Sequence, residues 1–297
     1  MTASGVDAKN TTSRAVPAEW HTLEYGPKPR IIPARMKARI LLPALLAVVV
    51  LTRPTLGIIV INSDESVCLA PPTDGSPWNY VARMENKFGA RATGVYLGRR
   101  YVLTANHIDH DINVVHLNGT NYTVDESFKP VELKGTDLRV MRIMQDPGLA
   151  PLPLIGVAES EFNKPCTMIG YGVGKGIEIP NQGWTWGEDP TRLKRWATNH
   201  TLPSYKTDLQ SHITYIQTPF DIAAGPQTGQ ITGGDSGCGL FENLGGVWKL
   251  VGIGADVEVD GKALYDKDAA APGNQPDHSY FVSLRQFVTQ INRIRGS

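Results

Sequence analysis

The segment GGDSGCGLF, residues 233–241, contains the most informative turn in the sequence. Glycines on both sides of Ser236 indicate a backbone that bends tightly enough to expose the serine hydroxyl. The same bend would leave backbone N–H groups free to point at a bound oxygen atom. Because a GDSG match also fits an ordinary turn, a base, an acid and a scaffold have to come from the rest of the sequence.

The composition is that of a globular protein. The chain has 297 residues, of which 41% are hydrophobic, and its formal net charge is +0. This is enough core for one large or two modest domains. The neutral balance gives no electrostatic reason to expect a nucleic acid or an acidic membrane as a partner. The 30 glycines and 21 prolines favour many short strands over long helices.

Three cysteines, Cys68, Cys166 and Cys238, are too few for a disulfide framework, and at least one thiol stays unpaired. No two of them have the spacing of metal ligands, which argues against a zinc site. We expect buried or partly paired cysteines. The sequence also lacks an acidic calcium loop of known spacing, and we expect neither a metal nor an organic cofactor.

Residues 36–57, MKARILLPALLAVVVLTRPTLG, have the pattern of a secretory signal peptide. A basic start precedes the apolar run 40–51, which is shorter than the roughly 20 residues that a membrane span needs. We therefore expect a secreted or periplasmic protein without a stable membrane span, with a signal anchor as the alternative. Because a signal peptide begins near its initiator, Met36 is the expected start. Residues 1–35 are then a disordered or over-extended N-terminus.

Short segments rich in β-branched and aromatic residues recur from residue 58 onward between turn signals, as expected for antiparallel hairpins. These segments are TGVYLGRRYVLTA (93–105), INVVHL (112–117), YTVDESF (122–128), LRVMRIM (138–144), CTMIGYGV (166–173), HITYIQT (212–218), GLFENLGGVWKLVGIGADV (239–257) and HSYFV (278–282). Residues 174–212 show no clear periodicity and are predicted to be a long loop region. Apolar residues at helical spacing in SLRQFVTQINRIR (283–295) predict one C-terminal helix. The pattern favours β-barrels or a sandwich.

A candidate base and a candidate acid stand at the ends of two predicted strands. His107 follows the strand in YVLTANHI, and its ordinary pKa near 6.5 suits a general base. Asp137 precedes the strand in GTDLRVMRI, where a carboxylate could accept an imidazole N–H. Asp137 also suits a turn, and six other histidines, including His110 and His116, leave alternatives open on spacing alone.

The order His107, Asp137, Ser236 differs from the orders found in subtilisins and α/β-hydrolases. The segments LTANH, TDLRVMRI and GGDSG resemble the three signature segments of chymotrypsin-like (trypsin-type, S1) serine proteases. The segment HSYFVSLRQFVTQI resembles the closing strand and C-terminal helix of that family. The resemblance covers about residues 58–295, and TGVYLGRRYVLTANH is most similar to bacterial secreted members, which have few disulfides.

The resemblance implies an all-β fold of two six-stranded antiparallel β-barrels with a C-terminal α-helix. The expected trypsin-like peptidase domain, 58–297, divides into barrel one at about 58–155, barrel two at about 156–282 and the helix at about 283–295. His107 and Asp137 would come from the first barrel and Ser236 from the second. We expect a monomer that acts on polypeptide substrates.

The resemblance also implies a mechanism. Ser236 would attack the scissile carbonyl while His107 accepts its proton, and Asp137 would orient the imidazole. The N–H groups of Gly234 and Ser236 would form the oxyanion hole. We expect a secreted serine endopeptidase that forms an acyl-enzyme, and the alternative is a catalytically silent relative that binds peptides. A lipase or esterase would need a G-x-S-x-G motif followed by an acid and then a histidine.

Asp235 has its own role in the family pattern, where it pairs with the ammonium group of a newly freed N-terminal Ile. Ile58 directly follows the predicted cleavage point after Gly57, so signal peptidase itself would create the activating terminus. The Val-Gly-Gly pattern that usually follows this Ile in the family is missing.

Gln230, six residues before Ser236, and Ala255 in GIGADV stand at expected substrate-binding positions. The neutral amide of Gln230 argues against a strong preference for Arg or Lys, although Asp256 could line the same pocket. The GIGADV strand lacks the serine that the family usually has near Ala255 and that helps to hold the acid, so we expect the acid to be oriented more loosely. Cys238 stands where a glycine is usual, and whether it pairs with Cys166 depends on geometry.

Overall fold

The computed structural model describes residues 57–61, 64–89, 91–189, 192–210, 212–258, 261–265 and 276–296. The chain divides into two compact units, Met1–Leu51 and Thr52–Ser297, and every described residue belongs to the second. The predicted N-terminal segment 1–35 and the predicted signal peptide 36–57 lie outside the described residues, except for Gly57. Over the described ranges, no helix has both the length and the apolar character needed to span a membrane.

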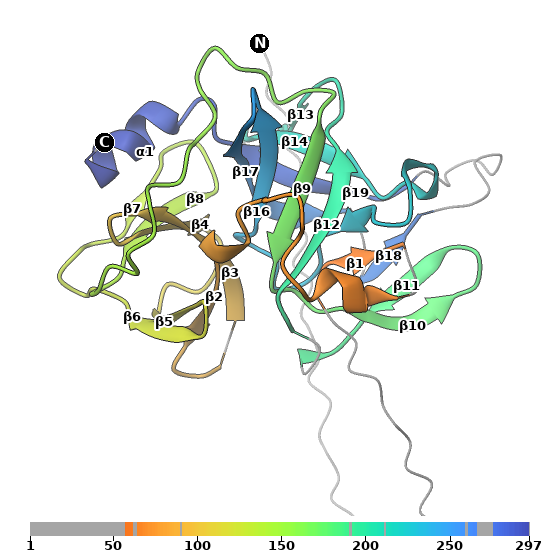
Figure 1. Cartoon of the computed structure of the whole chain (residues 1–297), viewed down its shortest axis with the longest axis horizontal. Coiled ribbons are helices and arrows are strands. Elements are labelled where there is room, and N and C mark those ends of the chain that lie inside the picture. The colour runs from red at the N-terminus through yellow and green to blue at the C-terminus, as the bar shows by residue number, and fades with distance from the viewer. Residues whose placement is uncertain are drawn as a thin grey trace, which may run out of the picture. The chain divides into compact units, whose positions relative to one another are not determined.

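The first large sheet has seven antiparallel strands in the order β6-β5-β2-β3-β4-β8-β7 (Figure 1). These strands are β2 (Val81–Asn86), β3 (Arg91–Gly98), β4 (Tyr101–Ala105), β5 (Ile112–Leu117), β6 (Thr120–Thr123), β7 (Val131–Glu132) and β8 (Leu138–Arg142). A bridge between Val124 and Ile143 brings the ends of β6 and β8 together. This contact curls the sheet toward a barrel.

The second large sheet also has seven antiparallel strands, in the order β12-β9-β16-β17-β19-β14-β13. They are β9 (Pro165–Gly170), β12 (Arg195–His200), β13 (Lys206–Thr207), β14 (Thr214–Pro219), β16 (Gly239–Leu244), β17 (Val247–Val257) and β19 (His278–Ser283). The Leu202 N–H, just after β12, donates to Gln217 O on β14 at a distance of 2.9 Å. The two sides of this sheet therefore also approach each other.

Two smaller sheets border the second large sheet. One contains β10 (Lys175–Ile179), β11 (Gly183–Trp186) and β18 (Lys262–Leu264), and the other contains β1 (Ile59–Val60) and β15 (Gly229–Gln230). The prediction of a long loop at 174–212 is therefore wrong, because β10 to β13 lie within it. Its strands are short or irregular, with a register shift between Lys175 and Glu178, which hides the period of two.

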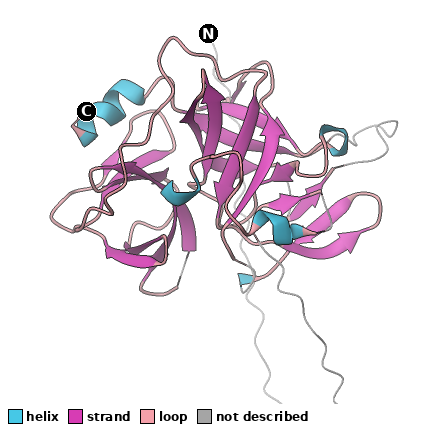
Figure 2. Ribbon diagram, viewed as in Figure 1, coloured by secondary structure: helices cyan, strands magenta, loops and turns pink. Residues whose placement is uncertain are grey.

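In the residues that the structure describes, helical structure is confined to short segments and the C-terminus (Figure 2). The 3-10 helices are η1 (Glu65–Cys68), η2 (Trp78–Tyr80) and η4 (Ile222–Ala224), and the α-helix is α1 (Val288–Arg295). The helix begins later than the predicted 283. The guanidinium of Arg295 donates to Leu97 O and Leu152 O, both at 3.0 Å, and so ties the C-terminus to the first half of the domain.

The prediction of an all-β fold with a C-terminal helix is confirmed. Each large sheet has seven strands in the described part of the chain, where six were expected, because the short edge strands β7 and β13 are added. Strand β2 was not predicted, since its polar residues conceal the buried positions Val81, Ala82 and Met84.

One hydrophobic cluster joins the two large sheets. It contains Val95 and Leu103 from the first sheet and Met168, Leu240 and Phe281 from the second, all fully buried. Burying a side chain of this size stabilises the fold by about 1.5–3 kcal/mol. The shared core fixes the relative position of the two sheets, and with it the position of any site between them.

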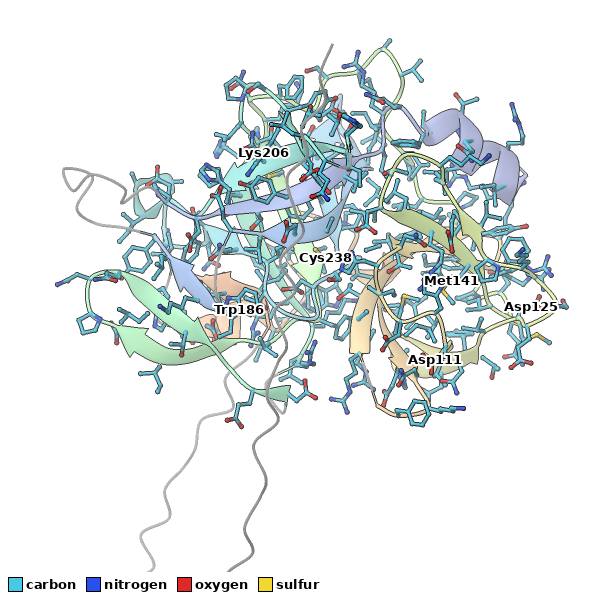
Figure 3. The ribbon with its side chains drawn as sticks, turned by 180° about the vertical axis from the view of Figure 1, so that it is seen from behind. Asp111, Asp125, Met141, Trp186, Lys206 and Cys238 are labelled. Atoms are coloured by element: carbon cyan, nitrogen blue, oxygen red, sulfur yellow. The ribbon has the colours of Figure 1, made fainter. Side chains whose placement is uncertain are left out.

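All three cysteines are buried and free, so Cys166 does not pair with Cys238. Burial raises the pKa of both thiols well above the ordinary value. Cys238 lies in the interior beside Gly254 of β17 (Figure 3), where a side chain at 254 would collide with its sulfur atom. These thiols act as small apolar side chains of the core.

Candidate active site

His107 and Asp137 meet because of the register of β4 and β8. Ala105 at the end of β4 pairs with Leu138 at the start of β8. His107 follows the first strand by two residues, and Asp137 directly precedes the second. Both side chains therefore emerge at the same edge of the first sheet.

The Asp137 carboxylate is held by three donors. Its Oδ1 atom accepts the N–H groups of Asn106 (2.9 Å) and His107 (2.8 Å), while Oδ2 lies 2.6 Å from His107 Nδ1. Only 14% of the Asp137 side chain is exposed, against 45% for His107. Two backbone amides thus orient the acid, although the strand near Ala255 has no serine hydroxyl to contribute.

Ser236 completes a chain of three side chains. Its Oγ atom lies 2.8 Å from His107 Nε2, on the opposite side of the ring from Asp137. The turn that contains Ser236 is fastened to the first sheet, because Ser236 O accepts the N–H of Thr93 on β3 (2.9 Å). Gly237 has φ +88°, and a Cβ there would collide with Thr93 O, so glycine is required next to the serine.

The backbone N–H groups of Gly234 and Ser236 are not used in holding the described structure together. Within the described part of the chain, neither the Gly234 N–H nor the Ser236 N–H donates a hydrogen bond to a protein acceptor. Both residues line a pocket of about 210 Å³ together with His107, Arg91 and Asp109. Gly234 has φ +92°, a conformation that favours glycine. Free N–H groups next to a serine hydroxyl can stabilise negative charge that develops on a substrate oxygen.

A family model described as Trypsin matches residues 70–266. The chain belongs to the trypsin family of serine-type endopeptidases. No curated protein matches the sequence of this protease.

Solved structures resemble the fold of this protease at low sequence identity. The HtrA-type protease AlgW, solved with a tripeptide, is 18% identical with a TM-score of 0.50, covering 73% of this chain and 60% of that chain. HL collagenase is 14% identical with a TM-score of 0.51, covering 74% of this chain and 94% of that chain. The inactive form of a serine-to-alanine mutant of Rv3671c from M. tuberculosis H37Rv is 12% identical with a TM-score of 0.47, covering 80% of this chain and 98% of that chain. The similarities to AlgW and HL collagenase concern the fold alone.

Neighbouring groups shift the pKa of the His107 imidazole in this protease. The hydrogen bond to Asp137 raises the pKa of His107 above 6.5, while burial and the charge of Arg139 act in the opposite direction. Arg139, whose side chain is almost fully buried, donates to Ile108 O (3.3 Å) and Asp109 O (2.9 Å) and thereby supports the loop that holds His107. Neither Arg139 nor Thr93 was singled out from the sequence, because nothing in their local patterns marks these long-range contacts.

The residues predicted for substrate binding, Gln230 and Ala255, are not among the residues that line this pocket. Gln230 is fully buried on β15, where it pairs with Ile59. Ala255 lies half-buried near the end of β17, and neither residue is among those that line the pocket with Ser236. Asp256, next to Ala255, is exposed, and its charge contributes to the raised pKa of His107.

Asp235 of the protease is fully buried. Its Oδ1 atom accepts the Gly172 N–H (2.6 Å) and its Oδ2 atom accepts the Thr232 N–H (2.9 Å). Burial raises the pKa of Asp235 to about 6, although these hydrogen bonds and the charge of Arg192 lower it. Ile58 is also fully buried. Gly57 packs against Gly172 O, which brings the segment to the neighbourhood of the carboxylate.

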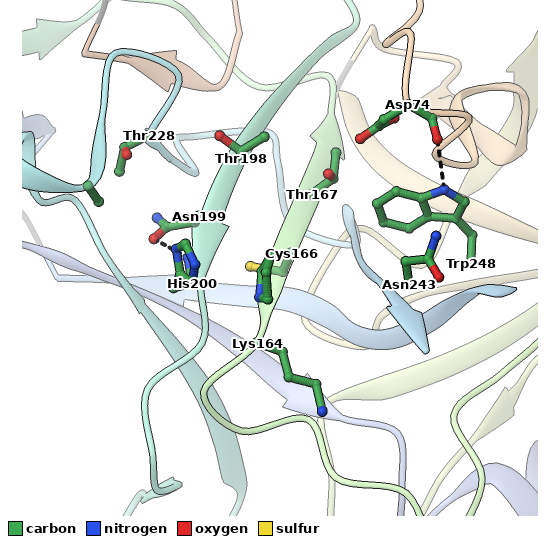
Figure 4. Close-up of a pocket in the computed structure, with 12 residues that line it drawn as sticks. Asp74, Lys164, Cys166, Thr167, Thr198, Asn199, His200, Thr228, Asn243 and Trp248 are labelled. Carbon is green, nitrogen blue, oxygen red and sulfur yellow. Dashed lines mark hydrogen bonds between the residues drawn. The ribbon is translucent and has the colours of Figure 1, made fainter. Parts of the chain in front are cut away.

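A second pocket, of about 290 Å³, lies on the second sheet of the protease (Figure 4). Trp248, Asp74, His200, Lys164 and Asn199 are among its lining residues, and the Trp248 indole donates to Asp74 O (3.1 Å). It contains none of the three side chains joined through His107.

Proposed function

We propose that the protein is a secreted serine endopeptidase in which Ser236, His107 and Asp137 form the catalytic triad. The observation that carries this proposal is the position of the His107 ring. Its two nitrogen atoms lie 2.8 Å from Ser236 Oγ and 2.6 Å from Asp137 Oδ2. One imidazole can then accept a proton from the hydroxyl while the carboxylate stabilises the resulting imidazolium.

In acylation, Ser236 Oγ attacks the carbonyl carbon of a peptide bond and its proton passes to His107 Nε2. The carbonyl oxygen becomes an oxyanion that accepts the N–H groups of Gly234 and Ser236, each worth about 3 kcal/mol in comparable sites. When the C–N bond breaks, His107 returns the proton to the leaving amine. This leaves an ester between Ser236 and the acyl half of the substrate.

In deacylation, a water molecule takes the place of the leaving amine. His107 accepts a proton from the water as its oxygen attacks the ester carbonyl, and the same two amides bind the oxyanion. The C–O bond to Ser236 then breaks, and His107 gives the proton back to Ser236 Oγ. The products are a carboxylic acid and the regenerated hydroxyl.

The remaining site residues are proposed to shape and activate this centre. The buried neutral side chain of Gln230, together with Ala255 on β17, fits a primary pocket without a strong preference for Arg or Lys. Cleavage after Gly57 would free the Ile58 ammonium beside the Asp235 region. A buried carboxylate with a raised pKa would be stabilised by such a cation.

Labelling with a fluorophosphonate probe tests the proposed function. The probe reacts with a serine only if the hydroxyl is activated and the oxyanion is stabilised. We expect wild-type protein to be labelled and Ser236→Ala to remain unlabelled. A folded wild-type protein that binds peptides but does not react would instead indicate the catalytically silent alternative.

A further inference from the structure

We infer that Arg192 is a positioning residue for the oxyanion hole: its guanidinium holds the peptide bond between Gly233 and Gly234 in the orientation that presents the Gly234 N–H to the substrate. This inference rests on the proposed function of Ser236 and the two free amides. Arg192 lies in the segment between β9 and β12, which is far from Ser236 in the sequence.

The Gly233 carbonyl is held by two donors from that segment. Its oxygen atom accepts the Val173 N–H at 2.8 Å and Arg192 Nη1 at 3.2 Å. The described residues contain no cis peptide bond. In a trans peptide the C=O and the following N–H point in opposite directions. A carbonyl anchored toward Val173 and Arg192 therefore keeps the Gly234 N–H on the other side.

This peptide needs an anchor because glycine stands on both sides of it. Glycine populates positive and negative φ about equally, so the Gly233–Gly234 peptide can rotate at little steric cost. Rotation would turn the carbonyl toward the oxyanion position, where it would repel the negative charge, and would break both hydrogen bonds. The two donors shift this equilibrium toward the productive orientation.

Arg192 is itself held in place. Its Nε atom donates to Asp189 Oδ1 (2.5 Å), and its side chain is only 15% exposed, against 67% for Asp189. The guanidinium occupies the space that a side chain at Gly234 would need. Arginine suits this position because its planar group can donate to a carboxylate and to a carbonyl at the same time.

The rest of the anchor comes from the β10–β11 hairpin. Trp186, at the end of β11 (Figure 3), packs over Gly233, with ring atoms at 3.4–3.5 Å from the position of a Cβ there. The backbone N–H of Trp186 donates to Gly261 O (2.7 Å), and β11 pairs with β18. The hairpin thereby holds Trp186 against Gly233, while Arg192, which follows the hairpin in the sequence, contacts the Gly233 carbonyl.

The test compares Arg192→Met and Arg192→Lys with the matched control Arg285→Met. Arg285 also donates to a loop carbonyl, Val157 O (3.0 Å), but in the described structure it has no hydrogen bond to Gly233 or Gly234. We expect Arg192→Met to lower kcat about tenfold with little change in KM, because only an interaction of the transition state is weakened. A peptide aldehyde, which forms an oxyanion on Ser236, should lose affinity by a similar factor. Arg192→Lys should recover part of both losses, and Arg285→Met should change neither.

Three kinetic results would overturn the inference. These are a kcat and aldehyde affinity for Arg192→Met within twofold of wild type, an increase in kcat, or a loss confined to KM. A crystal structure of Arg192→Met gives a readout that does not depend on activity: we expect the Gly233 carbonyl to be rotated or to adopt two orientations. If it keeps the wild-type orientation, Arg192 does not position the peptide. A failure of the proposed function would appear separately, as a wild-type protein that does not react with the fluorophosphonate.

Discussion

Ala105 and Leu138 are paired across β4 and β8, and this register carries His107 and Asp137 to one edge of the first sheet. The pairing of two apolar residues in the core thus decides the distance between an imidazole and a carboxylate. A slip of one residue would turn Asp137 to the other face of the sheet.

Replacing the nucleophile or the base should abolish activity without unfolding the protein. We expect Ser236→Ala or His107→Ala to lower kcat about 10⁶-fold, because removal of either residue disables the same proton transfer. The double variant should be no worse than either single variant, which steady-state kinetics on a peptide amide will check. Additive losses would show that the two side chains act independently.

Asp137→Asn should lower kcat about 10⁴-fold, since the amide stabilises the wrong tautomer of His107. The pH profile adds a second readout. The hydrogen bond to Asp137 raises the pKa of His107, and activity requires the neutral ring, so wild-type kcat/KM should fall as the pH drops through a pKa above 6.5. In Asp137→Asn this acidic limb should move to lower pH. A limb that stays in place would mean that another group controls it.

Gly234→Ala should impair the oxyanion hole, because φ at this position is +92° and the Arg192 guanidinium occupies the space of the new methyl group. We expect kcat to fall about 10²- to 10³-fold, the typical effect of losing one donor. Gly245→Ala is the matched control: φ there is +64°, but nothing lies near the added Cβ. An equal fall in kcat in the two variants would indicate general backbone strain rather than a specific effect on the oxyanion hole.

Activation by Ile58 predicts a defined N-terminus and an alkaline limit. Active secreted enzyme should begin at Ile58 on N-terminal sequencing, and Asp235→Asn should lose most of its activity. An ion pair with Asp235 would raise the pKa of the Ile58 amino group above its ordinary value of about 8. Activity should then be full below that pKa and decline as the pH rises through it. Fully active enzyme with another N-terminus contradicts this proposal.

Much of the fold could be predicted because strand patterns are local. The strands around His107, Asp137 and Ser236 each show apolar, β-branched or aromatic residues bounded by turn residues, and the C-terminal helix shows its own period. Strand β2 and the strands within residues 174–212 were missed, since their polar and irregular segments are stabilised by neighbouring strands rather than by local preference.

The sequence by itself determined the all-β class, the candidate residues and the glycines that the serine turn requires, because these depend on residue type and short-range spacing. Only the tertiary structure decided that His107 reaches Ser236 across 129 positions, that Cys166 and Cys238 remain free, and that Arg192 reaches the Gly233 carbonyl. Those contacts depend on how two sheets pack around a shared core. That packing is set by many side chains acting together and leaves no mark at any single position.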